Sequence, residues 1–159
     1  MVALFLVIYS HTIQIDILAM GMLGIFLLFN MYHINGFATT QFTTNAIDHE
    51  IAYAMNDAIS QYEEETDTKI INIGFAEDSH KEWTYSSTFT YAAGDQNIRA
   101  WANDWARPEM FHYVTGRDFT IVPVENEIYQ QYFEGKNWTS FNAEEQMIFI
   151  EDTVYLAIY

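Results

Sequence analysis

The sequence predicts an α/β protein in which a C-terminal transmembrane helix precedes a small layered α/β domain that ends in a β-hairpin. Residues 17–32 are apolar and contain neither a charged residue nor a proline. Asp16 is the only one of the 22 acidic residues before position 37, and the first basic residue is Lys69. After residue 36, segments with helical periodicity and short apolar segments follow one another, a pattern that is typical of layered α/β domains.

The first 36 residues predict transmembrane segments. Residues 1–9 are apolar but too short to cross a bilayer, whereas a last span over about 13–33 approaches the roughly 20 residues that the hydrocarbon core requires. Residues 10–16 then form a tight turn, and residues 1–9 are the partial end of a preceding span. This interpretation predicts a longer polytopic chain whose remaining transmembrane helices pack beside this one. A buried helix of a soluble protein stays an alternative, and a signal peptide lacks its basic n-region and cleavage site.

The flanks of the span contain no Lys or Arg, so the positive-inside rule does not fix the orientation directly. The absence of Lys and Arg from these flanks favours a cell-membrane protein whose α/β domain, residues 37–159, is extracytoplasmic.

Local patterns predict the elements of this domain in order. Asn35 and Gly36 end the spanning helix. An amphipathic helix starts near Thr44 and runs to Tyr62, with Asp48 on its exposed side. Apolar segments predict strands at residues 69–76, 119–124, 146–150 and 153–159. Helical spacing predicts helices at residues 97–105, 109–114 and 125–134. Residues 83–91 alternate aromatic and hydroxyl side chains and predict an edge strand or extended loop. The last two strands form a hairpin around Glu151 and Asp152.

Composition excludes several classes of function. The formal net charge is −16 with six basic residues, which argues against nucleic acid as a partner and against a polybasic membrane patch. The chain contains no cysteine, so disulfides and cysteine-based zinc sites are excluded. No motif predicts a metal or a cofactor.

Candidate substrate-binding residues are polar or aromatic side chains in loop-like segments. They are Asp78, His80, Trp83, Tyr85, Arg99 and Arg107. Asp78 and His80 follow a strand, where ligands of layered α/β domains bind; a solvated loop is the alternative. Trp83 and Tyr85 are candidates to stack on sugar rings.

The two arginines could recognise phosphate, although salt bridges with the many carboxylates are the default interpretation for Arg99 and Arg107. Trp101 and Trp105 stand four residues apart and are predicted to be core.

Taken together, the layout resembles the C-terminal end of polytopic bacterial membrane proteins of the glucosyltransferase type that modify O-antigen or related cell-envelope polysaccharides. The matching features are apolar residues 17–32, a helix with Asp48, Ala52, Asn56 and Tyr62, the strand at 70–74 and the hairpin at 147–159.

The resemblance implies a last transmembrane helix followed by a small extracytoplasmic α/β domain of a membrane glycosyltransferase, with a lipid-linked sugar or polysaccharide as partner. In such enzymes the catalytic acid lies on early loops that this chain lacks, so no catalytic residue is expected here. The alternative is a stand-alone membrane-anchored carbohydrate-binding or protein-interaction module without catalytic activity.

Overall fold

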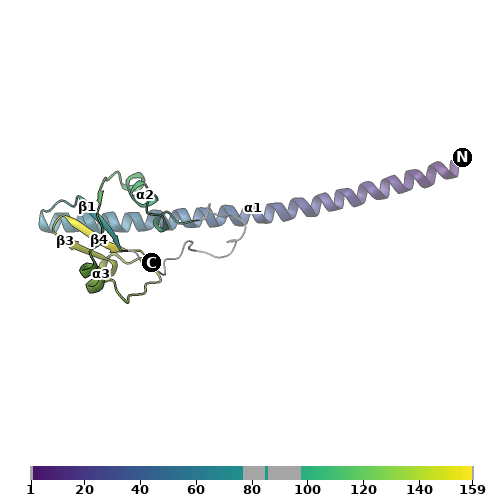
Figure 1. The fold of residues 1–159 in the computed structure, drawn as a ribbon. Helices are drawn as coiled ribbons and strands as arrows, with labels where there is room; N and C mark the ends of the chain where they lie inside the picture. Colours follow the sequence, from purple (N-terminus) through teal and green to yellow (C-terminus); the bar gives the residue numbers. More distant parts are fainter. Residues whose placement is uncertain (1, 77–84, 86–97, 159) are drawn as a thin grey trace.

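A computed structural model describes residues 2–76, 85 and 98–158 of the chain. Helix α1 (Val2–Thr66) is a continuous α-helix of 65 residues. At roughly 1.5 Å per residue it is about 98 Å long. A small mixed α/β region gathers around its C-terminal half, and the N-terminal half projects away from that region (Figure 1).

The continuity of α1 corrects two sequence predictions. The expected turn at residues 10–16 and the expected helix end at Asn35 and Gly36 are both wrong, because the helix is continuous through both segments. Polar side chains in this stretch bond to their own helix: Asn30 Nδ2 donates to the carbonyl of Phe26 at 2.7 Å, and Thr40 Oγ1 donates to that of Gly36 at 3.0 Å. Without a proline, an interior glycine costs only about 1 kcal/mol, which the rest of the helix tolerates.

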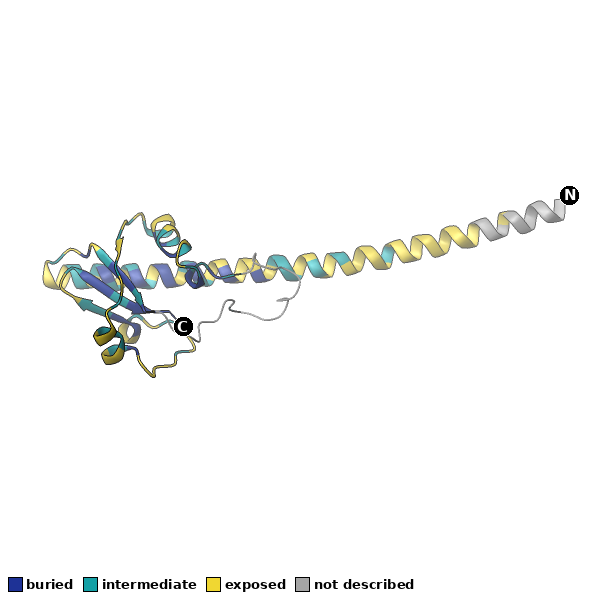
Figure 2. Ribbon diagram, in the orientation of Figure 1, coloured by how far each residue is buried: buried dark blue, intermediate teal, exposed yellow. Residues whose placement is uncertain are grey.

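The two halves of α1 differ in exposure. From Ile13 to Asn35 the side chains are exposed or half-buried, and they include large apolar groups such as Ile25, Leu28 and Phe29. From Thr40 to Ile59 a buried residue recurs every three or four positions (Figure 2). By its length and composition, the helix could cross a membrane.

Within the described residues, four strands form one mixed sheet in the order β2-β1-β4-β3. The strands are β1 (Asn72–Ala76), β2 (Thr120–Ile121), β3 (Met147–Ile150) and β4 (Thr153–Ala157). Strand β1 is parallel to both β2 and β4, whereas β3 and β4 are antiparallel. The predicted hairpin around Glu151 and Asp152 is confirmed, and Glu151 has a positive φ of 55°.

Short helices connect and cover the sheet. They are η2 (Ala100–Ala102), α2 (Ala106–Thr115), α3 (Asn126–Tyr132) and α4 (Ala143–Gln146). The helices expected near 109–114 and 125–134 are confirmed as α2 and α3. The helix expected at 97–105 is wrong, because in its described part, residues 98–105, only the 3-10 turn η2 forms. Of the strand or loop expected at 83–91, only Tyr85 lies among the described residues.

Alternate residues of the strands face two apolar clusters. On one face, Ile73, Val154 and Leu156 pack against α1 and α2. On the other face, Ala76 and Ala157 pack with α3 and with Phe133, which follows it. The sheet is therefore the middle of three layers, as the sequence predicted for a layered domain.

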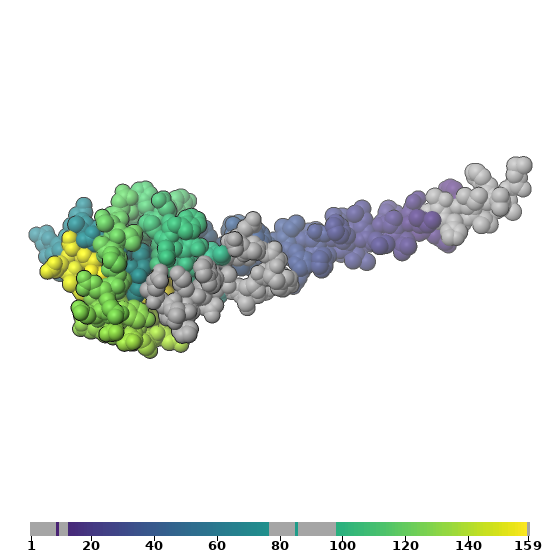
Figure 3. All heavy atoms as spheres, in the orientation of Figure 1, coloured from purple at the N-terminus to yellow at the C-terminus, as the bar shows by residue number. Residues whose placement is uncertain are grey.

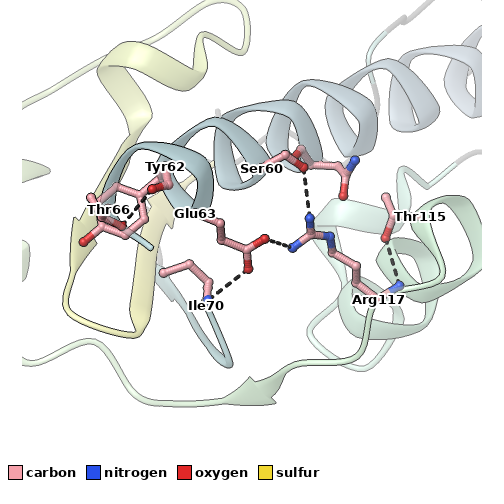
Figure 4. Close-up of polar contacts among 8 residues, drawn as sticks. Ser60, Tyr62, Glu63, Thr66, Ile70, Thr115 and Arg117 are labelled. Atoms are coloured by element: carbon pink, nitrogen blue, oxygen red, sulfur yellow. Dashed lines mark hydrogen bonds and ion pairs between the residues drawn. The ribbon is translucent and has the colours of Figure 1, made fainter. Parts of the chain in front are cut away.

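The C-terminal end of α1 is fixed by polar contacts (Figure 4). Glu63 accepts hydrogen bonds from the Ile70 backbone N–H at 3.0 Å and from Arg117 Nη1 at 2.9 Å. Arg117 also donates to Ser60 Oγ at 2.9 Å. The side chain of Glu63 is therefore half-buried, although it belongs to the acidic run that ends α1.

Strand β1 runs back along α1 after the turn at Asp67, whose φ is 55°. Tyr62 near the end of α1 stacks on Phe149 of the hairpin, while Asp48, four turns earlier, contacts η2. The carboxyl ends of β1, β2 and β4 therefore point toward the exposed half of α1, and the C-terminus lies on that side (Figure 1). The space-filling view shows the domain at one end of the long helix α1 (Figure 3).

Candidate functional site

A groove of about 690 Å³ opens at the carboxyl ends of β1 and β2. Phe75 of β1 and residues 121–124 form one wall. Asp104, in the turn before α2, and Arg107, in the first turn of α2, form the second, and α3 contributes Asn126 and Tyr129. Side chains from three separate segments of the chain thus meet at one edge of the sheet.

The position of this groove follows from the order of the strands. In chain order α2 follows β1 and packs on one face of the sheet, and α3 follows β2 and packs on the other. Connections that diverge from adjacent parallel strands leave a crevice at their carboxyl ends, and this is where open α/β sheets bind ligands.

Arg107 is held rigidly in this groove. Its Nε donates to the carbonyl of Trp101 at 2.8 Å, and its Nη1 forms an ion pair with Asp104 at 2.9 Å. The guanidinium carbon lies 5.0 Å from the centre of the Phe75 ring. Arg107 is only 6% exposed, whereas the side chain of Asp104 is 65% exposed and presents its carboxylate to solvent. The default interpretation of Arg107 as a salt-bridging residue is confirmed.

The polar groups of the groove suit an uncharged ligand with several hydroxyls. The lining side chains include the Asp104 carboxylate, the Arg107 guanidinium, the Asn126 amide and the Tyr129 phenol, and these groups between them can donate and accept hydrogen bonds. The charges of Asp104 and Arg107 cancel, which disfavours a free anion. Among the described residues, no cluster of three or more His, Asp or Glu side chains could hold a metal ion.

Asp48 marks a second polar centre, on α1. One carboxylate oxygen accepts from the Tyr85 hydroxyl at 2.8 Å, and the other accepts from the Ala100 backbone N–H at 2.8 Å. The indole N–H of Trp101 donates to the backbone carbonyl of Asp48 at 3.1 Å. Burial raises the pKa of the Asp48 carboxyl, against the lowering effect of the hydrogen bonds from Ala100 and Tyr85 and of the charge on Arg99. The prediction that Asp48 is on the exposed side of its helix is wrong, because it is 4% exposed.

The structure brings some of the sequence candidates together and separates others. Tyr85 and Arg99 lie beside Asp48, with the Arg99 guanidinium 4.8 Å from the centre of the Tyr85 ring. Arg107 lies in the groove at the sheet edge instead.

The remaining sequence candidates, Asp78, His80 and Trp83, lie outside the described residues.

The two tryptophans at four-residue spacing have opposite environments. Trp101 is fully buried, as predicted, but the prediction that Trp105 is core is wrong, since it is 77% exposed. The physical reason is that η2 ends at Ala102 and a turn precedes α2, so the two rings do not share a helix face.

Sequence reasoning missed Asp104, Asn126 and Tyr129. A signal existed for the first, because Asp104 and Arg107 have the three-residue spacing of a helical ion pair. Asn126 and Tyr129 carry no local signal, since only the strand order brings α3 to this edge.

Comparison of the chain with protein-family models, curated proteins and solved structures finds no match.

Proposed function

We propose that this chain is a membrane-anchored carbohydrate-binding domain. In this proposal α1 crosses the cell membrane over about residues 13–33, and the α/β domain lies on the extracytoplasmic side. The observation that carries the proposal is the groove at the carboxyl ends of β1 and β2, where Asp104, Arg107 and Asn126 converge.

The exposed half of α1 supports the anchor. Large apolar side chains cover all sides of the helix there; Ile25 is 70% exposed and Leu28 is 68% exposed. Leaving apolar surface in water costs about 25 cal/mol per Å², whereas about 20 helical residues match the hydrocarbon core of a bilayer. The absence of Lys and Arg before Lys69 supports the extracytoplasmic side.

The chemistry of the groove supports a saccharide. Its volume of about 690 Å³ is in the range of small-molecule sites. The Asp104–Arg107 pair offers acceptors and donors without net charge, which matches vicinal hydroxyls better than phosphate or carboxylate. The hydrogen bond from Arg107 to Trp101 fixes the guanidinium before a ligand arrives, so little ordering entropy remains to be lost on binding.

The direction of the strands supports a ligand near the bilayer. Because the carboxyl ends of β1 and β2 point toward the exposed half of α1, a bound sugar would lie on the membrane side of the domain. A lipid-linked sugar or a cell-envelope polysaccharide fits this position. The relation to a multi-span glycosyltransferase stays a prediction, because the groove argues for saccharide binding whichever enzyme acts on the sugar.

The test is saccharide binding by the full chain in detergent micelles, measured by calorimetry against a panel of neutral envelope oligosaccharides. Asp104→Asn removes the charge of an exposed groove residue, and Asp57→Asn makes the same change on the exposed side of α1. We expect Asp104→Asn to weaken binding about tenfold, corresponding to roughly 1.4 kcal/mol, and Asp57→Asn to leave it unchanged. The proposal fails if no neutral saccharide binds, or if the two variants behave alike.

A further inference from the structure

A second groove, of about 720 Å³, runs along α1 beside η2 and the start of α2. Residues of α1 from Phe37 to Asp48 line one side, and the other side comes from residues 98–110. Asn103, Trp105 and Ala106 belong to this groove, whereas Asp104 and Arg107 belong to the sheet-edge groove. The segment between η2 and α2 thus separates the two grooves.

This groove begins where the proposed span ends. Phe37 follows His33 by one helical turn, roughly 6 Å along the axis. Phe42 and Trp105 line the groove and are 76% and 77% exposed. Aromatic side chains that are exposed next to a spanning helix are typical of the membrane–water interface.

The polarity of the lining changes with distance from the proposed span. Phe37 and Ala38 lie nearest to it, and Thr44 and Asp48 lie roughly 10–15 Å further along α1. Thr44 is 6% exposed, and within the described part of the chain its hydroxyl has no hydrogen-bond partner. A buried hydroxyl of this kind requires a partner, and a ligand hydroxyl would supply one.

We infer that this groove binds a neutral glycolipid of the adjacent leaflet. Its hydrocarbon chain lies along Phe37 and Trp105 and continues into the bilayer, and its sugar hydroxyls reach Thr44. The described lining contains no Lys or Arg, and the carboxyl of Asp48 lies at the polar end, so an anionic phospholipid headgroup is disfavoured. This inference rests on the proposed membrane anchor but concerns a different groove from the saccharide site.

The experiment uses the full chain in phosphatidylcholine nanodiscs that contain equal amounts of monogalactosyl diacylglycerol and phosphatidylglycerol. Native mass spectrometry then reports which lipid the released protein retains. Thr44→Val removes the buried hydroxyl at nearly constant shape, and Thr43→Val makes the same change at the exposed neighbouring position. Ala38→Trp fills the groove at its membrane end. Circular dichroism verifies that each variant is folded.

We expect the wild-type chain and Thr43→Val to retain the glycolipid at least fivefold over phosphatidylglycerol. Thr44→Val should reduce this retention about fivefold, and Ala38→Trp should abolish it. Equal retention of the two lipids, preference for phosphatidylglycerol, or identical behaviour of the two threonine variants would overturn the inference.

Failure of this inference and failure of the proposed function are distinguishable. Soluble saccharide binding in the same preparations reports on the groove of Asp104, which the threonine variants do not touch. Lost lipid selectivity with retained saccharide binding refutes only the glycolipid inference. A chain that does not insert into nanodiscs refutes the anchor and the inference together.

Discussion

Gly74 is the position in the sheet where the addition of one methyl group, by the substitution Gly74→Ala, has the clearest predicted effect on stability. It lies in the middle of β1, opposite Tyr155 of β4. A Cβ added to Gly74 would lie 2.6 Å from Cδ1 and 3.0 Å from Cε1 of the Tyr155 ring, and 3.3 Å from the carbonyl oxygen of Val122. The first two separations are too short for carbon atoms, so Gly74→Ala forces the ring or the strand to move.

The magnitude follows from two opposing terms. Overpacking of this kind costs about 1–3 kcal/mol. Replacing glycine by alanine also restricts the unfolded chain, which stabilises the folded state by about 0.4–1 kcal/mol. We therefore expect Gly74→Ala to lower the free energy of unfolding by about 1–2 kcal/mol and the Tm by roughly 2–8 °C.

The assay is thermal unfolding of the full chain in detergent, followed by near-ultraviolet circular dichroism, in a double-mutant cycle with Tyr155→Ala. Without the Tyr155 ring, Gly74→Ala should lower the free energy of unfolding much less. The double-mutant cycle should therefore give an interaction free energy between the two positions of at least about 1 kcal/mol. Gly21→Ala is the control, because a Cβ there meets no atom within 4 Å. If Gly74→Ala costs the same with and without the Tyr155 ring, the packing argument is refuted.

Three further predictions concern α1 and its contacts. Asp48→Asn tests the raised pKa: a buried carboxyl that favours its protonated form contributes stability below the ordinary pKa of 3.8, and this contribution disappears as the pH rises through the folded-state pKa. The difference in the free energy of unfolding between the wild type and Asp48→Asn, measured by urea titration, should thus fall as the pH rises above 3.8. A difference that does not change with pH would contradict the raised pKa. Arg117→Met removes the half-buried contacts to Glu63 and should cost about 1–2 kcal/mol in the same titration, whereas no loss would show that solvent screens the pair. Tyr62→Ala removes the ring stacked 4.4 Å from Phe149 and should cost about 2 kcal/mol, which chemical denaturation measures; an unchanged midpoint would exclude a stabilising stack.

The elements of the domain were predictable where the pattern of apolar residues reflects burial. Strand β1 and the closing hairpin alternate between the two clusters, so their residues carry the signal of both faces. The continuity of α1 was not predictable from the same patterns. Asn35 and Gly36 are local helix breakers, but their cost of about 1 kcal/mol each is small beside the cooperativity of a 65-residue helix.

The candidate site was predictable only in part, because its residues depend on tertiary structure. Arg107 stood out from the sequence as one of few basic residues in an acidic chain. Its neighbours Asn126 and Tyr129 reach it only because β2 lies beside β1 and α3 crosses the opposite face of the sheet. Asp48 was misplaced for a related reason: its helix face is polar in sequence, yet η2 and Tyr85 cover it.

In the proposed membrane-anchored arrangement, the single uninterrupted helix α1 also fixes how the domain is rotated relative to the bilayer and how far it lies from it. Each residue of an α-helix turns the chain by roughly 100° and advances it by about 1.5 Å. Insertion of one alanine after Gly36 would therefore swing both grooves by more than a quarter of a turn about the axis of α1, without altering any contact inside the domain. Insertion of seven residues would nearly restore the original facing while lifting the domain by about 10 Å. The rotation of the domain about α1 and its distance from the bilayer can thus be changed separately. The binding of a ligand that contacts both bilayer and domain would depend on each of them differently.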